Sequence, residues 1–297
     1  MRQFCLCLSL VFLLSACGSA PTGDTPKQDE VLSLVVTTYP LYLFASELTK
    51  NVDGVQVDCV VNQPISCLHD YTLNVRDMQS LENADVIVEN GVNLEAFMDD
   101  ALRASHADVI DCSEGIALLP LKEDPTVNDP HIWMDPDRAA AMIQTLSNGL
   151  SRLDPTHSEQ YAANCTQAVE TLRNAKQSLK AELASLSCRE LITFHDGFSY
   201  FADSFDLTIL KAIEEEAGSE PSAKEISAIA DLIQLNKIPA IFTEVNGSDA
   251  TAKALAKETS VSIHTLSMIM SGDSKDPGLS IYLSALEANV SAIKEAL

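Results

Sequence analysis

Short apolar runs rich in β-branched residues alternate with helix-like segments over most of the chain, and this alternation constrains the fold more than any other feature. The helix-like segments include residues 93–105 and 279–296. The strand-like runs lie at residues 32–38, 55–61, 85–90, 108–112, 190–194, 207–213, 239–244 and 261–266. Unbroken apolar runs are typical of strands buried on both faces, and strands that alternate with helices usually pair in parallel. The pattern therefore predicts an α/β protein with parallel sheets covered by helices.

One long helical stretch, at residues 154–186, interrupts this alternation. Asp154 can cap its start, Pro155 fits its first turn, and neither Gly nor Pro occurs after Pro155 within it. At 1.5 Å per residue such a helix would be about 45 Å long. The chain beyond the N-terminus is therefore expected to form an N-terminal β/α lobe over residues 32–153, a linking helix over 154–187 and a C-terminal β/α lobe over 188–297.

The N-terminus predicts export and a lipid anchor. Residues 1–16 carry one early positive charge and an apolar run shorter than the roughly 20 residues that a membrane-spanning helix needs. The segment "LLSAC" looks like a lipobox, which implies cleavage before Cys17 and attachment of lipid to Cys17. An ordinary secretory signal peptide is the alternative. Residues 17–31 are small and polar, as in a flexible tether, so we expect a protein held by lipid at the outer face of the cell membrane.

The chain is strongly acidic, with 43 acidic and 19 basic residues and a formal net charge of −24. Loss of residues 1–16 would remove Arg2 and no acidic residue, which makes the mature protein slightly more acidic still. Such a charge argues against nucleic-acid and anionic-lipid partners and favours solubility. We expect a monomer that touches the membrane only through its lipid.

An odd number of cysteines follows Cys17, so at least one of them is expected to be unpaired. They are Cys59, Cys67, Cys112, Cys165 and Cys188. No CxxC spacing occurs, which argues against a zinc site made of thiolates. A disulfide among Cys59, Cys67 and Cys112 would suit an exported protein, although the sequence does not fix the pairing.

Three histidines follow predicted strands. His69 lies in the loop after the second strand, His131 in the loop after the fourth, and His195 directly after the fifth. In open parallel sheets, ligands collect just beyond the carboxyl ends of the strands. These positions therefore place imidazoles from both lobes at the ligand-binding edges of the sheets.

Each of these histidines has a carboxylate close to it in the sequence. The carboxylates are Asp70 beside His69, Asp129 and Asp135 around His131, and Asp196 beside His195. A metal-bound imidazole usually donates its other N–H to a carboxylate or carbonyl, which fixes the orientation of the ring. Pro130 and Pro136 stiffen the loop of His131, and Trp133 can exclude water from it. We favour one shared metal site over the alternative of histidines held only by turn chemistry.

The segments "CLHDYTL", "DPHIWMDP" and "FHDGFSYFADSF", with the long helix and the lipobox, resemble the zinc- and manganese-binding solute-binding lipoproteins of bacterial ABC importers, the TroA-like group. The resemblance covers residues 32–297. It implies two β/α lobes joined by a rigid helix, with one divalent metal between them. Carried over to this sequence, it implies metal ligands at His69, His131 and His195.

The fourth ligand is where this sequence departs from the family pattern. The resemblance implies a carboxylate just after the last strand, but "HTLSMIMSGD" has Ser267 there, and a hydroxyl is a poor substitute for a carboxylate. The alternatives are Glu244 at the end of a strand, Asp273, a water molecule, or the acidic run at residues 214–216. We choose Glu244, for which a role in orienting a ligand or capping a helix is an equal alternative.

Three imidazoles suit Zn²⁺, whereas Mn²⁺ prefers more oxygen ligands, so we expect zinc, with manganese as the alternative. The predicted function is capture of the ion outside the cytoplasm and its delivery to an ABC permease. The chain has no GxxxxGK[ST] motif, so the ATPase and the permease must be separate proteins. A zinc hydrolase with a metal-bound water is one alternative, although the chain lacks HExxH, and an adhesin-type lipoprotein is the other. We expect a binding protein and not an enzyme.

Overall fold

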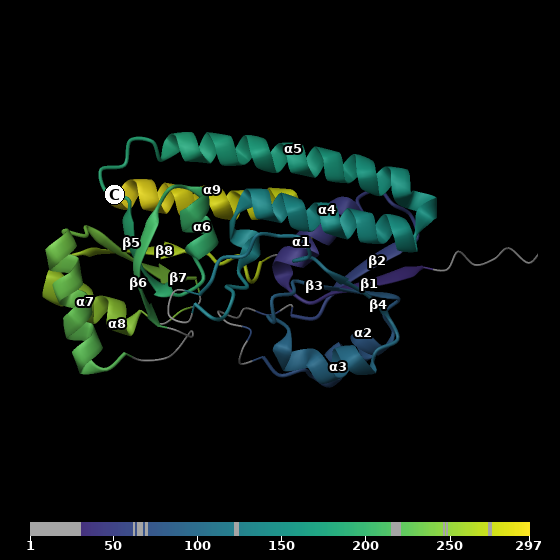
Figure 1. The fold of residues 1–297 in the computed structure, drawn as a ribbon, viewed down its shortest axis with the longest axis horizontal. Helices are drawn as coiled ribbons and strands as arrows, with labels where there is room; N and C mark the ends of the chain where they lie inside the picture. The colour runs from purple at the N-terminus through teal and green to yellow at the C-terminus, as the bar shows by residue number, and fades with distance from the viewer. Residues whose placement is uncertain are drawn as a thin grey trace, which may run out of the picture. The chain divides into compact units, whose positions relative to one another are not determined.

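The computed structural model describes residues 31–61, 63, 68, 71–121, 125–214, 221–245, 247, 249–272 and 275–297, with only the backbone of residue 214. Residues 31–297 form one compact unit. Within the described residues, one four-stranded sheet precedes the long helix α5 (Ser158–Glu182) in the sequence, and a second four-stranded sheet follows it (Figure 1). The predicted fold class, an α/β protein with two β/α lobes and a long helix between them, is confirmed. The lobe boundaries at residues 153 and 188 remain a prediction.

The two sheets have the same strand order. It is β2-β1-β3-β4 in the first sheet and β6-β5-β7-β8 in the second, and all the pairs are parallel. The carboxyl ends of the strands in each sheet therefore lie along one edge, as the predicted ligand-binding edges require. The strands are β1 (Leu32–Val36), β2 (Val55–Cys59), β3 (Val86–Glu89), β4 (Asp108–Asp111), β5 (Glu190–His195), β6 (Thr208–Glu214), β7 (Ala240–Glu244) and β8 (Ser262–Leu266).

Helices cover the sheets, and α1, α4, α5 and α9 pack against one another. Their buried side chains form one apolar cluster with residues from both sheets, which gives residues 31–297 a continuous core. Besides α5, the helices are α1 (Tyr39–Leu48), α2 (Val75–Glu82), α3 (Asp99–Ala104), α4 (Pro136–Leu153), α6 (Ser199–Ser204), α7 (Ala223–Asn236), α8 (Ala250–Thr259) and α9 (Leu279–Ala296), with 3₁₀ turns η1 (Ala96–Met98), η2 (Ile132–Met134) and η3 (Pro155–His157).

The linking helix is shorter than the predicted span of 154–187. Residues 155–157 form η3, and α5 begins only at Ser158 and ends at Glu182. At 1.5 Å per residue α5 is about 38 Å long. Asp154 is the N-cap residue of η3 and not of α5, and its carboxylate contacts Nδ1 of His157 (2.6 Å) and accepts a hydrogen bond from the hydroxyl of Tyr161 (2.8 Å).

The single helix predicted over residues 93–105 is also wrong. Val92 and Asn93 have φ angles of +55° and +62°, which no α-helix adopts, and the chain then forms η1 and the short helix α3. The Glu95 carboxylate turns back and accepts hydrogen bonds from the backbone N–H groups of Asn90 (2.7 Å) and Gly91 (3.2 Å). Burial raises the pKa of Glu95 to about 7. These hydrogen bonds from the backbone to the Glu95 side chain take the place of the first turn of the predicted helix.

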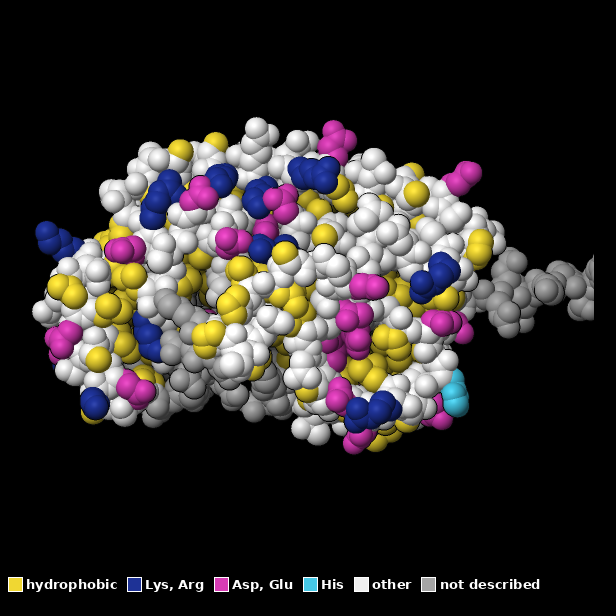
Figure 2. All heavy atoms as spheres, in the orientation of Figure 1, with side chains coloured by type: hydrophobic (Ala, Val, Ile, Leu, Met, Phe, Trp, Pro, Cys, Tyr) yellow, Lys and Arg dark blue, Asp and Glu magenta, His cyan; other side chains and the backbone are white. Residues whose placement is uncertain are grey.

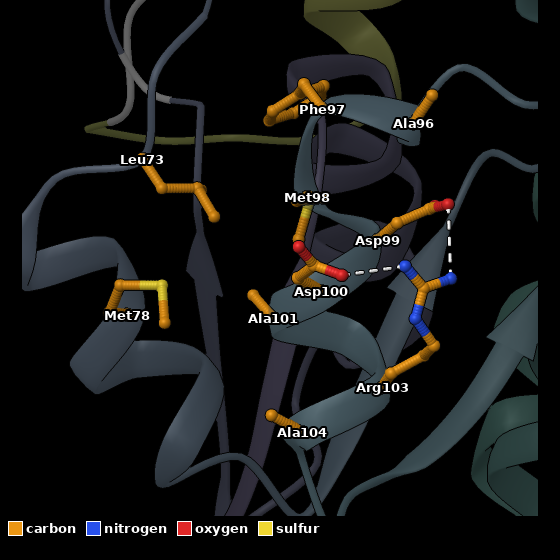
Figure 3. A pocket seen from close by; sticks show the side chains of 10 residues that line it. All are labelled: Leu73, Met78, Ala96, Phe97, Met98, Asp99, Asp100, Ala101, Arg103 and Ala104. Atoms are coloured by element: carbon orange, nitrogen blue, oxygen red, sulfur yellow. Dashed lines mark hydrogen bonds and ion pairs between the residues drawn. The ribbon is translucent and has the colours of Figure 1, made fainter.

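A pocket of about 410 Å³ lies between α2 and α3 (Figure 3), and Leu73, Met78 and Phe97 are among the residues that line it. At its rim Arg103 pairs with Asp99 (3.4 Å) and Asp100 (2.8 Å). Figure 2 shows acidic and apolar side chains together on this part of the face. The lining contains none of the predicted metal ligands, so this pocket is separate from the site described next.

In the part of the chain that the structure describes, no helix has the length and apolarity needed to cross a membrane.

Candidate metal centre

The structure brings His131 and His195 together, although 64 residues separate them in the sequence. Their Nε2 atoms are 3.3 Å apart, and the ring planes are nearly perpendicular at 88°. Both side chains are buried, with 8% of His131 and 4% of His195 exposed. An imidazole nitrogen from the loop after β4 and one from the end of β5 therefore face one another in the interior.

His131 is held by Asp129, as the aspartates in the loop suggested. One carboxylate oxygen of Asp129 accepts a hydrogen bond from the backbone N–H of His131 (2.9 Å) and lies 2.7 Å from Nδ1 of its ring. An ionised carboxylate can only accept, so this contact favours a ring proton on Nδ1 and leaves Nε2 as the nitrogen for a metal. Asp129 is fully buried, and its second oxygen has no hydrogen-bond partner among the described residues. The Nε2 atom that faces His195 is thus the one able to bind a metal.

His195 is held in a different way, because it is the last residue of β5, between β6 and β7. Its Nδ1 atom lies 3.7 Å from a carboxylate oxygen of Glu244, the last residue of β7. Glu244 therefore contacts the ring nitrogen on the side away from His131. This position suits an acid that orients the imidazole, the alternative that the sequence left open for Glu244.

Of the other residues predicted for the site, Asp135 contacts other groups, Asp196 is buried directly after His195, and the rest lie outside the described residues. Asp135 contacts Arg138, Lys176 and Ser204, not His131. Asp196 is 7% exposed. The calls on Cys17, His69, Asp70, Asp273 and residues 215–216 lie outside the described residues, as does the side chain of residue 214. So does Cys67. The described cysteines, Cys59, Cys112, Cys165 and Cys188, form no disulfide with one another.

Ser267, at the position where the family pattern has a carboxylate, serves the local turn. Its hydroxyl oxygen accepts a hydrogen bond from the backbone N–H of Ile269 (3.1 Å). Its own backbone N–H donates to the side-chain oxygen of Asn289 on α9 (2.7 Å), whose amide donates back to the carbonyl of Ser267 (2.8 Å). The loop after β8 is therefore fastened to α9 without a carboxylate at this position.

Two residues near the rings were missed by the sequence analysis. The backbone carbonyl of Met268 accepts a hydrogen bond from the indole N–H of Trp133 (2.9 Å), which ties the loop after β8 to the loop of His131. A Cβ atom added to Gly197 would lie 2.4 Å from the end of Met268, 2.7 Å from the His195 ring and 3.2 Å from the His131 ring. Only the glycine directly after "HD" could have signalled this close approach.

The distance between the rings fits a tetrahedral ion. At Zn–N bonds of about 2.0–2.1 Å, two nitrogen ligands of a tetrahedral ion are roughly 3.3–3.4 Å apart, and the observed separation is 3.3 Å. Among the described residues, no group of three or more His, Cys, Asp or Glu side chains has the geometry of a metal site. His131 and His195 are therefore candidates for two ligand positions, and a complete site would need further ligands from outside the described residues or from solvent.

Comparison with known proteins identifies the family. The profile described as "Zinc-uptake complex component A periplasmic" matches residues 34–296. The chain belongs to this zinc-uptake family. The predicted resemblance to solute-binding proteins of metal importers is confirmed, and so is the expectation of a binding protein and not an enzyme, because the family is that of an uptake component. The family's periplasmic description also agrees with the predicted position outside the cytoplasm.

Relatives from the zinc-uptake family and its structural neighbours cover nearly the whole chain. The high-affinity zinc uptake system protein ZnuA of Bacillus subtilis (strain 168) is 24% identical over 96% of this chain and 94% of its own length. The iron-binding protein YfeA of Yersinia pestis is 27% identical over 91% of this chain and 87% of its own. A crystal structure of ZnuA has a TM-score of 0.78 and 27% identity, and covers 90% of this chain and 99% of that chain.

Proposed function

We propose that the protein captures one Zn²⁺ ion between its two sheets, with His69, His131 and His195 as ligands, and delivers the ion to an ABC permease driven by a separate ATPase. The observation that carries the proposal is the 3.3 Å separation of the two Nε2 atoms, which matches two ligands of one tetrahedral zinc ion. Membership of the zinc-uptake family supports it. His69 is assigned as the third ligand by the resemblance alone.

The acids beside the two rings have orienting roles in this proposal. Asp129 keeps the proton of His131 on Nδ1, and Glu244 lies next to Nδ1 of His195. Both Nε2 atoms are then directed at the ion, and each bound imidazole is backed by a carboxylate. In this proposal Glu244 orients His195 and is not itself a ligand. The fourth ligand is then Asp273 or a water molecule.

Zinc is the proposed cargo because imidazoles supply the ligands, whereas manganese prefers more oxygen donors. The names of the relatives include both zinc and iron binders, so the choice between metals rests on the ligands of this chain. The binding role requires the ion to be taken up and released, and the buried, preoriented rings lower the ordering cost of its capture.

Metal analysis and calorimetric titration of the full-length protein, purified without a histidine tag, test the proposal. We expect one Zn²⁺ per chain, with manganese binding more weakly. A chain that binds no zinc above background would contradict the proposal and favour the adhesin-type alternative, in which the histidines are structural.

A lipid anchor at Cys17 completes the proposal. It would hold the protein at the outer face of the membrane, within reach of the permease, as the "LLSAC" segment implies. Cys17→Ser should move the protein from the membrane fraction to the soluble fraction of the cell. Unchanged fractionation of that variant would overturn the anchor and leave metal capture unaffected.

A further inference from the structure

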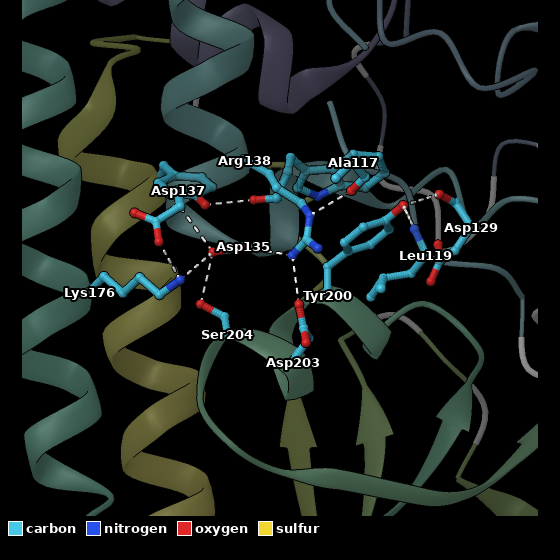
Figure 4. Close-up of polar contacts among 12 residues, drawn as sticks. Ala117, Leu119, Asp129, Asp135, Asp137, Arg138, Lys176, Tyr200, Asp203 and Ser204 are labelled. Atoms are coloured by element: carbon cyan, nitrogen blue, oxygen red, sulfur yellow. Dashed lines mark hydrogen bonds and ion pairs between the residues drawn. The ribbon is translucent and has the colours of Figure 1, made fainter. Parts of the chain in front are cut away.

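A buried ionic cluster joins the start of α4 to α5 and α6 (Figure 4). Its centre is Asp135, of which only 4% is exposed. The Asp135 carboxylate accepts hydrogen bonds from Arg138 (2.7 Å), Lys176 (3.0 Å) and the hydroxyl of Ser204 (2.9 Å), and from the backbone N–H of residue 137 (3.0 Å). A buried carboxylate with this many donors is well satisfied, and such networks hold their elements in one arrangement.

Arg138 extends this cluster to Tyr200 on α6. Its guanidinium also pairs with Asp203 (2.9 Å) and donates to the carbonyl of Ala117 (3.2 Å). It lies over the Tyr200 ring, with Cζ 4.7 Å from the ring centroid, at a distance that gives a favourable cation–π contact. Figure 4 shows the Tyr200 side chain between Arg138 and the loop that holds Asp129. The position of the Tyr200 ring is thus set from one side by a cation that is itself fixed by two carboxylates.

The hydroxyl of Tyr200 reaches the residue that orients His131. It donates a hydrogen bond to the backbone carbonyl of Asp129 (2.8 Å) and accepts one from the backbone N–H of Leu119 (3.0 Å). Tyr200 is fully buried. The helix that carries Tyr200 follows His195, whereas Asp129 precedes His131 by two residues. A single hydroxyl thus links the segment after one ring to the backbone of the residue whose carboxylate supports the other ring.

We propose that Tyr200 is a positioning residue of the metal centre, whose hydroxyl holds the backbone of Asp129 so that the Asp129 carboxylate keeps Nε2 of His131 directed at His195. The inference rests on the proposed metal-binding function. Because Tyr200 follows His195 on the same segment, it fixes the relative position of the two rings before any ion arrives. A metal site prepared in this way avoids the cost of ordering its ligands on binding.

The simpler interpretation is that Tyr200 is an ordinary buried tyrosine whose hydroxyl only satisfies nearby backbone groups. Both interpretations predict a loss of stability when the hydroxyl is removed. Only the positioning role predicts a loss of zinc affinity larger than that caused by an equivalent deletion elsewhere. The chain offers such a deletion at Tyr161, which is also fully buried and donates its hydroxyl to Asp154 (2.8 Å).

The experiment compares Tyr200→Phe with the matched control Tyr161→Phe in the full-length protein. Zinc affinity is measured by competition with a chelating dye, and thermal unfolding is measured on the metal-free proteins. Removing groups that support metal ligands typically costs about 10–100-fold in affinity, so we expect Tyr200→Phe to weaken zinc binding by about 10-fold. Tyr161→Phe should leave the affinity unchanged, even where its loss of stability is as large.

The outcomes separate this inference from the proposed function. Stoichiometric zinc binding by the unaltered protein, with equal affinity in Tyr200→Phe, would overturn the positioning role and leave the proposed function intact. Equal weakening by both variants would overturn it as well, because a general loosening would then explain the effect. Failure of the unaltered protein to bind zinc would overturn both proposals.

Arg138→Gln provides a second test if Tyr200→Phe does not fold. It removes the cation over the ring and keeps the Tyr200 hydroxyl. We expect zinc affinity to fall by about three-fold, less than for loss of a direct support of a ligand. Lys180→Gln is its control, because Lys180, on α5, forms an exposed ion pair with Asp206 (2.8 Å). Unchanged affinity in Arg138→Gln would contradict the inference.

Discussion

The two sheets share one strand order, yet they present their histidines in different ways. In the first sheet the edge strand β4 ends at Asp111, and His131 lies well beyond that end, in the loop that leads to α4. In the second sheet His195 is itself the last residue of β5, which pairs with strands on both sides. The same topology thus carries one candidate ligand on a loop and the other on a strand.

The difference shows what holds each ring in place. The backbone of His195 is fixed by the parallel pairing of β5 with β6 and β7. Among the described residues, the loop of His131 has only an isolated antiparallel bridge between Pro120 and Asn128, with a backbone hydrogen bond from the N–H of Asp129 to the carbonyl of Leu119 (2.8 Å). Beyond these it is held by side chains, including Asp129, Trp133 and the amide of Asn90, which donates to the carbonyl of Pro130 (3.0 Å). Metal binding should therefore be sensitive to the loss of supporting side chains around His131. Around His195 it should be sensitive to added bulk at the end of β5.

Loss of either ring should have the largest effect on metal binding. We expect His131→Ala and His195→Ala each to weaken zinc binding by more than about 100-fold, which exceeds the usual effect of losing a supporting group. Titration calorimetry measures the affinity, and His264→Ala, on β8, is the control. Equal affinity in the control and in either variant would refute the site.

Glu95, which supports the His131 loop through Asn90, should make the stability of the metal-free protein depend on pH. Glu95 accepts hydrogen bonds from the backbone of Asn90 and from the hydroxyl of Thr37 (2.7 Å), and Asn90 in turn holds Pro130. Burial raises the pKa of Glu95 from 4.5 to about 7. Between these values the folded protein binds a proton that the unfolded chain has released, so stability falls as the pH rises through this range and is constant above it.

The expected loss between pH 4.5 and 7 is up to about 3 kcal/mol, from about 1.4 kcal/mol per pKa unit. Chemical denaturation of the metal-free protein across this range measures it, and Glu95→Gln should remove this part of the slope. Glu182→Gln, an exposed acid on α5, is the control and should keep the slope. A slope in Glu95→Gln as steep as that of the unaltered protein would show that Glu95 is ionised in the folded state.

Removal of the acids that support the rings should distinguish the two halves. Asp129→Ala leaves the loop without the oxygen that binds both the backbone and the ring of His131, and we expect a loss of about 10–100-fold in zinc affinity. Glu244→Gln should cost less than about 10-fold, because β5 still fixes His195. The reverse order of effects, measured by dye competition, would indicate that Glu244 is a ligand after all.

The smallest expected effect comes from Gly197→Ala. The added Cβ would meet the rings of His195 and His131 at 2.7 and 3.2 Å, and the end of Met268 at 2.4 Å. Met268 can move aside, whereas the rings are held by their partners, so we expect a few-fold loss of zinc affinity, below the 10–100-fold range of lost supports. Met268→Ala combined with Gly197→Ala should recover only part of that loss. Full recovery would mean that Met268, and not the rings, is the obstacle.

Much of the fold could be predicted from the sequence, because apolar runs indicate which segments are buried in the core. The strand positions and α9 (Leu279–Ala296) follow from such patterns. The predicted helix over residues 93–105 failed because Glu95 bonds to the backbone of Asn90 and Gly91, a local interaction that periodicity does not record. The predicted end of the long helix was too late, because no Gly or Pro marks the end of α5 at Glu182.

The topology of the sheets was enough to predict where the candidate ligands lie, but not which side chains support them. The rule that ligands collect at the carboxyl ends of strands is enough to place His131 and His195 on facing edges. It does not reveal that Asp129 orients His131 while Asp135 instead binds Arg138, because both aspartates lie within a few residues of His131 in the sequence. Nor does it reveal Tyr200 or Met268, whose roles depend on contacts between distant segments.

X-ray absorption at the zinc edge of the loaded protein tests the central claim most directly, because it counts the imidazoles around the ion. We predict nitrogen ligands at about 2.0–2.1 Å with scattering from three imidazole rings, and one ring fewer in either His131→Ala or His195→Ala. A spectrum of the unaltered protein with oxygen ligands only, or with a single imidazole, would contradict the account.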